Sequence, residues 1–258
     1  MNYKLNGISI ATYEANPIAT NQHFALYGIF DLPKRIGKTE HNWGTSIEPF
    51  VDEEDIELDG RTLTLHVGVK HENLDTFIQA CVACEKLSID YDVFDVVCKD
   101  EIQVRAIGSQ QYFDLVTVPF WQDKYRVGSL DINPSASGAF RLDEFDLNRD
   151  LGVYVSESGN LFNMAKRIDI PTTELYERTN YRASRDITLR CSMMGHTFAG
   201  VYNNMKRFHS LLMAPGMRTL TTPNKTLEVY FKSGMVVKAI KSNILQFNIT
   251  ATRCDNNI

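Results

Sequence analysis

Alternating apolar and polar residues predict a long strand in each half of the chain. In GRTLTLHVGVK, residues 60–70, an apolar side chain occupies every second position, which is the period of a strand with one buried face. SRDITLRCSMM, residues 184–194, repeats the pattern about 124 residues later, so that Arg61 corresponds to Arg185 and Leu65 to Leu189. We therefore predict two equivalent strands.

An amphipathic helix is predicted after each strand. In residues 71–88 the apolar side chains fall three or four positions apart, on one helical face: Leu74, Phe77, Ile78, Cys81, Cys84 and Leu87. In residues 195–212 the corresponding side chains lie at the same offset: Phe198, Val201, Tyr202, Met205, Phe208 and Leu211. Asn73 and Thr197 are the predicted N-caps. A strand and a helix repeated in one register favour a duplicated domain.

Further strands are predicted around each strand–helix pair. Residues 93–108 and 218–234 have the pattern of strand, turn and strand, and residues 111–122 and 243–254 that of a final alternating strand. Upstream, residues 3–17 resemble residues 145–159.

One helix among many short strands predicts a mostly β (α+β) fold. We expect two tandem units, each a β-sandwich or open barrel with one flanking helix. Residues 129–140 are rich in Ser, Gly and Pro and are the predicted linker. The predicted domains are therefore residues 1–128 and 141–258.

Composition and charge fit a soluble, folded protein. The chain has 258 residues, of which 43% are hydrophobic and 23% charged. It shows neither a signal peptide nor an apolar run long enough for a membrane helix, so we expect folding in a cytoplasm without membrane contact. The net charge of −5 divides into −9 over residues 1–128 and +4 over residues 129–258. The acidic stretch 52–59 fits a solvated loop; alternatively, halves of opposite sign would favour head-to-tail stacking.

No sequence motif points to catalysis, a cofactor or a metal. Cys81 and Cys84 form C-x-x-C, which we interpret as two buried thiols because both continue the helical stripe and no nearby His completes a zinc set. The six histidines form no metal-binding pair and are expected on the surface or in turns, with His209 on the polar side of the second helix. We predict no catalytic, cofactor-binding or metal-binding residue, and no enzymatic activity.

Several stretches of the first half resemble the N-terminal domain of tailed-phage distal tail proteins. They are FDLPKRIGKTEHNWGTS, GRTLTLHVGV and EIQVRAIGSQQYFDLVTVPFWQ. That family shows a loop with Pro and Arg, an Arg-led strand, a helix, and a strand pair with an I-x-V-x-x-x-G pattern. Here the pattern is met by Ile102, Val104 and Gly108, echoed by Leu227, Val229 and Gly234. The resemblance covers residues 20–125 well and 145–255 more weakly.

The resemblance implies a virion structural protein of a phage or prophage. The family shares its fold with tail-tube proteins, a β-sandwich flanked by one helix, whose sheets join neighbours into a ring. Implied partners are further copies of the chain in a trimeric or hexameric ring, other tail and baseplate proteins, and DNA that passes through the lumen without specific binding. The implied location is the virion tail, assembled in the bacterial host cytoplasm. A second tube-like unit departs from distal tail proteins with a lectin-like second domain, so tube, distal collar and baseplate hub all stay open.

Two other classes of function also stay open. One is a carbohydrate-binding module that uses Trp43 or Trp121 as a stacking platform. The other is a hydrolase whose acidic residues the sequence does not single out. The loops at residues 33–59 and 166–184 are long for a compact domain, and we expect them to mediate contacts between subunits or rings.

Overall fold

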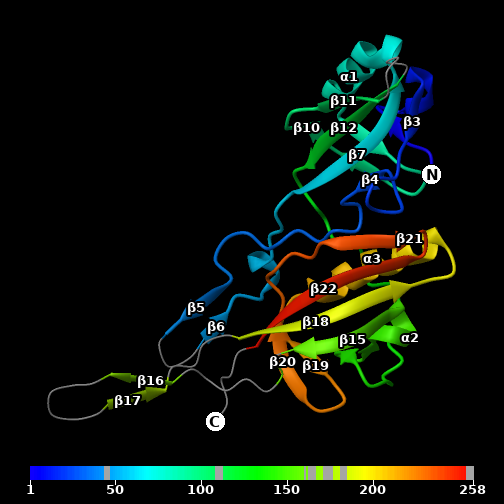
Figure 1. The fold of residues 1–258 in the computed structure, drawn as a ribbon. Coiled ribbons are helices and arrows are strands. Elements are labelled where there is room, and N and C mark those ends of the chain that lie inside the picture. The colour runs from blue at the N-terminus through cyan, green and yellow to red at the C-terminus, as the bar shows by residue number, and fades with distance from the viewer. Residues whose placement is uncertain are drawn as a thin grey trace.

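The chain adopts a mostly β fold with few helices (Figure 1). A computed structural model describes residues 1–43, 47–107, 113–159, 161, 167–170, 177–180 and 185–253. The predicted mostly β (α+β) class is confirmed. No helix in these described residues is long and apolar enough to cross a membrane.

The first half begins with short strands and then forms two long ones that run side by side. Its elements are β1 (Lys4–Leu5), β2 (Ile8–Ser9), the 3-10 helix η1 (Ile10–Tyr13), β3 (Ala15–Pro17), β4 (Leu26–Tyr27), β5 (Glu40–Asn42), β6 (Ile47–Pro49), the 3-10 helix η2 (Glu53–Asp55), β7 (Arg61–Lys70), the 3-10 helix η3 (His71–Asn73), α1 (Leu74–Val82), β8 (Lys86–Ser88), β9 (Val93–Asp95), β10 (Val97–Cys98), β11 (Gln103–Ile107) and β12 (Phe113–Gln122).

The second half contains a longer helix and a second pair of long strands. Its elements are β13 (Arg141–Leu142), β14 (Phe145–Asp146), α2 (Leu147–Leu151), β15 (Val153–Gly159), β16 (Arg167–Ile170), β17 (Glu177–Asn180), β18 (Arg185–Met194), α3 (Phe198–Leu212), β19 (Arg218–Thr221), β20 (Thr226–Tyr230), β21 (Val237–Lys241) and β22 (Ile244–Arg253). Residues 123–140, all of which are described, contain neither helix nor strand and connect the halves.

The strand pairings follow the same order in both halves. A short hairpin, β1–β2 or β13–β14, leads into a strand beside the long strand, β3 on β7 or β15 on β18. After the helix, the hairpin β8–β9 or β19–β20 returns to pair with β1 or β13. The last strand, β12 or β22, pairs with the whole of β7 or β18, and β11 or β21 lies on its other side. One topology is thus built twice.

The two halves differ in how their sheets close. Among the described residues, the first half forms a four-stranded and a six-stranded sheet. In the second half β20 also pairs with β22, which joins the strands into one eight-stranded sheet. In each half the alternating apolar residues of the long strand are buried, and the helix packs against that strand.

The structure corrects the sequence register at two places. The hairpin at residues 4–9 corresponds to residues 141–146, five residues earlier than the predicted match at 146–151, because each hairpin pairs with the strand that follows α1 or α3. Leu227 and Val229 are not the counterparts of Ile102 and Val104. They lie in β20, which pairs with β19 as β9 pairs with β8, whereas β11 corresponds to β21.

The helix predictions are confirmed for α3 and need shortening for α1. The α1 helix ends at Val82, and Cys84 and Leu87 are buried from the turn and from β8 that follow it. Thr197 is the N-cap of α3, since its hydroxyl accepts from the Gly200 amide at 3.1 Å. Asn73 precedes α1, but its side chain makes no capping bond to any described residue of the helix.

We predict that Thr197→Ala destabilises the protein by about 1 kcal/mol, because the first turn of α3 loses a partner for a backbone N–H. Asn73→Ala, at the equivalent position before α1, is the matched control and should cost clearly less, since among the described residues its side chain bonds Glu14 alone, at the surface. Urea unfolding followed by circular dichroism measures both. Equal losses in the two variants would contradict this assignment.

Candidate functional site: the junction between the two halves

The first half covers the outer edge of β21 in the second half. Leu32 and Met235 form an antiparallel bridge with N···O distances of 2.9 and 2.8 Å. The amide of Val237 donates to Asp31 Oδ1 at 2.7 Å, and the amide of Ala239 donates to Gln22 Oε1 at 3.2 Å. In return, the carbonyl of Ala239 accepts from the His23 amide at 3.1 Å. Residues 22–32 therefore satisfy backbone groups that an edge strand leaves unpaired.

A glycine in the second half makes this close approach possible. A Cβ at Gly234 would lie 2.8 Å from both the Leu32 carbonyl oxygen and the Lys34 backbone nitrogen. Just beyond this point the Arg35 amide donates to the Lys232 carbonyl at 3.0 Å, and Lys232 Nζ lies 2.8 Å from Glu40. The first-half chain is thus held against the second half on both sides of the glycine.

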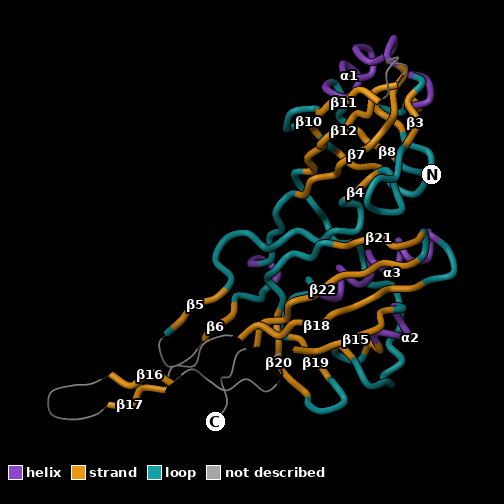
Figure 2. The backbone as a smooth tube through the Cα atoms, viewed as in Figure 1, coloured by secondary structure: helices purple, strands orange, loops and turns teal. Residues whose placement is uncertain are grey.

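The helix α3 forms the second contact between the halves. The hydroxyl of Ser210 donates to the Gly128 carbonyl at 2.7 Å. Arg207 forms a bidentate ion pair with Asp131, with N···O distances of 2.7 and 3.2 Å. One face of α3 therefore packs on its own sheet and the other on the first half and the connecting segment. Figure 2 shows the loops that cross between the halves.

Aromatic side chains fill the space between these polar contacts. Phe198, at the start of α3, has its ring centroid 5.0 Å from that of Phe24 and 5.8 Å from that of Phe30. Tyr202, one turn later, lies 5.9 Å from Phe30. Rings from the two halves are thus in contact at the spacings preferred by aromatic pairs.

Arg61 is a buried cation at the centre of the junction. Its side chain is 7% exposed. Nη1 donates to the carbonyls of Ile29 at 3.1 Å and Asp31 at 2.8 Å, and Nε donates to Gln122 Oε1 at 2.8 Å. The guanidinium carbon lies 4.4 Å from the centre of the Tyr125 ring. Burial lowers the pKa of Arg61, but a guanidinium stays charged at neutral pH.

His209 is buried at the junction, which corrects the prediction that it lies on a solvated face of α3. The residue is 1% exposed, and its Nδ1 is hydrogen-bonded to the Tyr125 hydroxyl. Burial, together with the nearby charge of Arg61, lowers the pKa of His209 to about 3, although hydrogen bonding to the Phe30 backbone opposes the shift. The imidazole is therefore neutral near pH 7. Burial also raises the pKa of Tyr125 to about 12, so the phenol keeps its proton.

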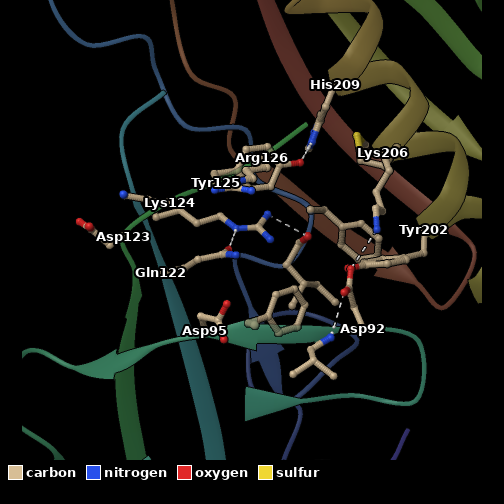
Figure 3. Close-up of a pocket in the computed structure, with 16 residues that line it drawn as sticks. Asp92, Asp95, Gln122, Asp123, Lys124, Tyr125, Arg126, Tyr202, Lys206 and His209 are labelled. Atoms are coloured by element: carbon tan, nitrogen blue, oxygen red, sulfur yellow. Dashed lines mark hydrogen bonds and ion pairs between the residues drawn. The ribbon is translucent and has the colours of Figure 1, made fainter. Parts of the chain in front are cut away.

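A cavity of about 530 Å³ lies between these groups (Figure 3). Its lining comes from residues 29–30, from the start of β7, from β9 and the residue before it, from the end of β12 and the segment after it, and from α3. Asp92 reaches across the junction: its Oδ2 accepts from the Tyr202 hydroxyl at 2.7 Å and from Lys206 Nζ at 3.1 Å. These bonds hold the pKa of Asp92 below its usual value, against the opposing effect of burial.

The residues proposed from the sequence for other functions lie elsewhere. Cys81 and Cys84 are buried free thiols, as predicted, and burial raises the pKa of both. Trp121 has Lys99 Nζ 4.0 Å from the centre of its ring, whereas Trp43 is 63% exposed and donates to Glu48. Within the described residues, no group of three or more His, Cys, Asp and Glu side chains is arranged to hold a metal ion.

The two long loops fall partly within the described residues. The loop at residues 33–59 contacts the second half of its own chain, since the Gly216 amide donates to the Val51 carbonyl at 2.7 Å. The acidic residues Asp52, Glu53 and Glu54 within it are exposed, as expected for a solvated loop. The loop at residues 166–184 is described only at β16 and β17, so the prediction for its remainder lies outside the described residues.

Sequence reasoning passed over the residues that build the junction. The pattern predicts Arg61 as the first residue of a strand and His209 as a polar residue of a helix, and gives neither a role. One signal was available. Arg61 falls in the same alternation as the apolar residues of β7, all of which are buried, so its side chain is directed to the same side of the strand. Asp31 and Gln22 lie in loops, where no hydrophobic periodicity predicts that their side chains bond the backbone of β21.

We predict that Gly234→Ala loosens the junction and destabilises the protein by about 1–3 kcal/mol, because the added methyl group meets backbone atoms that cannot yield without moving the chain. Gly128→Ala, where the nearest atoms lie 3.9 Å away, is the control and should be nearly neutral. Hydrogen exchange by mass spectrometry should show faster exchange at residues 22–35 in the first variant alone. Unchanged exchange there would refute the contact.

We predict that stability falls as the pH is lowered from about 6.5, because the unfolded chain then protonates His209 while the folded chain does not. The expected slope is about 1.4 kcal/mol per pH unit for this group. His209→Gln should remove most of this dependence on pH. A shallower slope should remain from His66, because burial also lowers the pKa of His66. Denaturant midpoints between pH 7 and 5 measure the effect. His196→Gln, at an exposed position, is the control, and equal profiles for wild type and His209→Gln would contradict the assignment.

Comparison with known proteins gives no family to which the chain can be assigned. No protein-family model matches it, and neither the curated proteins nor the solved structures gave a match. The function is therefore argued from the geometry of the junction.

Proposed function

We propose that this protein is a self-assembling structural subunit of a phage or prophage tail or baseplate, without catalytic activity. In this proposal the chain joins head to tail with further copies of itself to form a ring, as a trimer or a hexamer. Other tail or baseplate proteins bind the ring, and DNA passes through its lumen. The support comes from the repeated topology and from one difference between the two repeats.

The difference lies in the strands β11 and β21, which occupy the same place in the two halves. The pair Arg61 and Gln122 in the first half corresponds to the pair Arg185 and Arg253 in the second. Counting along the strands from these two pairs makes Val104 the counterpart of Val237. Val237 is 2% exposed because the first half covers it, whereas Val104 is 44% exposed. Among the described residues, none donates to or accepts from the outer backbone groups of β11. This uncovered edge is the observation that carries the proposal.

From the repeat we infer that the second half of another copy of the chain would cover this edge. In the first half the covering residues follow β3 and precede β7, and the equivalent segment of the second half follows β15 and precedes β18. If that segment of one copy covers β11 of the next, the contact inside the chain is repeated between chains. Such a contact uses two different surfaces, so it propagates until rotation closes a ring.

The hairpins inserted at this same position suit contacts between rings. The hairpin β5–β6 lies between β3 and β7, and the hairpin β16–β17 lies between β15 and β18. Figure 1 shows both hairpins extending from the same side of the molecule. Two hairpins on one side of the molecule could both contact the same neighbouring ring or partner protein.

We predict that the protein forms rings and that Val104→Lys prevents them, because a charge on the edge of β11 opposes pairing with another chain. Mass photometry and negative-stain microscopy measure the assembly over a range of concentrations. Met194→Lys, which places the same charge at a site that is 47% exposed on β18, is the control and should leave rings intact. A chain that stays monomeric at high concentration, or rings that survive Val104→Lys, would contradict the proposal.

A further inference from the structure

The cavity at the junction contains hydrogen-bond donors that the described part of the chain leaves unused. Arg61 donates through Nε and Nη1, and no described residue accepts from its Nη2. Gln122 accepts from Arg61 through Oε1, which leaves its amide NH₂ without an acceptor among the described residues. Lys206 donates to Asp92 alone in the same set, although an ammonium has three N–H groups.

The carboxylate of Asp92 is, in contrast, already hydrogen-bonded. Asp92 accepts at Oδ2 from Tyr202 and Lys206, and at Oδ1 from the backbone amide of Val93 at 2.9 Å. A ligand beside Arg61 and Lys206 thus meets free donors and a carboxylate that already accepts three hydrogen bonds. It must bring acceptors of its own.

The charges of the side chains that line the cavity favour a negative ligand. Arg61 and Lys206 supply two positive charges and Asp92 one negative charge. The remaining charged residues of the lining balance one another, since Lys124 and Arg126 are matched in number by the exposed carboxylates Asp95 and Asp123. The carboxylates of Asp31 and Asp92 act on Arg61 through their charge, but its hydrogen bonds all go to neutral groups among the described residues. A buried guanidinium in this state gains from an anion within hydrogen-bonding distance.

We propose that this cavity binds an oxyanion, the carboxylate or phosphate group of a small ligand, at Arg61 Nη2 and the amide NH₂ of Gln122. Figure 3 shows Gln122 and Lys206 on opposite sides of the cavity, so that a ligand bound at Gln122 has Lys206 across from it. The volume of about 530 Å³ leaves room for an organic body beside the anionic group. Because Gln122 belongs to the first half and Lys206 to the second, the bound ligand would tie the halves together. This binding is independent of the ring proposed above.

The test is isothermal titration calorimetry with sodium phosphate and, separately, sodium acetate, at an ionic strength held constant with sodium chloride. Saturable binding of either anion is expected, and acetamide, the neutral analogue of acetate, should not bind. Tighter binding of phosphate assigns a phosphorylated ligand, and tighter binding of acetate assigns a carboxylic acid. Failure of both anions to bind overturns the proposal.

Substitution of Gln122 locates the site. Gln122→Glu places a carboxylate of the chain itself beside Arg61, so the dissociation constant of the anion should rise at least tenfold while the melting temperature without ligand stays the same or rises. Gln79→Glu makes the same change on the exposed face of α1 and is the control. Lys206→Met gives a second measure and should weaken binding about threefold. Undiminished binding in both cavity variants overturns the assignment.

Discussion

The arrangement of the two halves depends on the need to satisfy the backbone groups along the outer edge of β21. An unpaired edge is exposed to any strand that reaches it, and a buried N–H without an acceptor costs free energy of about 1–3 kcal/mol. Here the first half supplies the partners, partly from its backbone and partly from side chains. Asp31 serves twice, because its carboxylate accepts from the Val237 amide and its carbonyl accepts from Arg61. Covering the edge and anchoring the buried cation are therefore one structural requirement.

This requirement explains why two copies of one topology have diverged. Val237 and Ala239 in β21 are buried under the first half, whereas their counterparts Val104 and Ala106 in β11 are exposed. The helices differ in the same sense. The helix α1 has nine residues and one face against its sheet, whereas α3 has 15 residues and buries His209 and Ser210 on the side that faces the first half. Each repeat is thus fitted to its neighbours within the chain.

The sequence was sufficient for the parts of the fold that repeat with a regular period. Alternation located β7 and β18, and the three-to-four spacing located both helices, because one face of each element is buried by its own sheet. The period of α1 was overextended because Leu87, in the next strand, faces the same core as Phe77. The short hairpins were matched out of register because strands of two residues have no period. Their turns depend instead on residues with positive φ, Asn6 in one and Asp143 in the other.

The junction was beyond such patterns for a further physical reason. His209 lies four residues after Met205 and seven after Tyr202, so helical spacing places it beside the apolar stripe of α3. A polar residue at the border of such a stripe is assigned to solvent, and His209 is instead buried by a second surface from a distant part of the chain.

The polar character of the junction also determines how specific its register is. Gln22, His23 and Asp31 each bond a particular backbone group of β21, so a shift along the strand would leave several of them unpaired at once. Apolar contact alone would tolerate such a shift. A second chain that covers β11 must therefore present polar groups at the same spacing. Discrimination between correct and incorrect neighbours would then arise from a few hydrogen bonds, while the apolar area supplies most of the attraction.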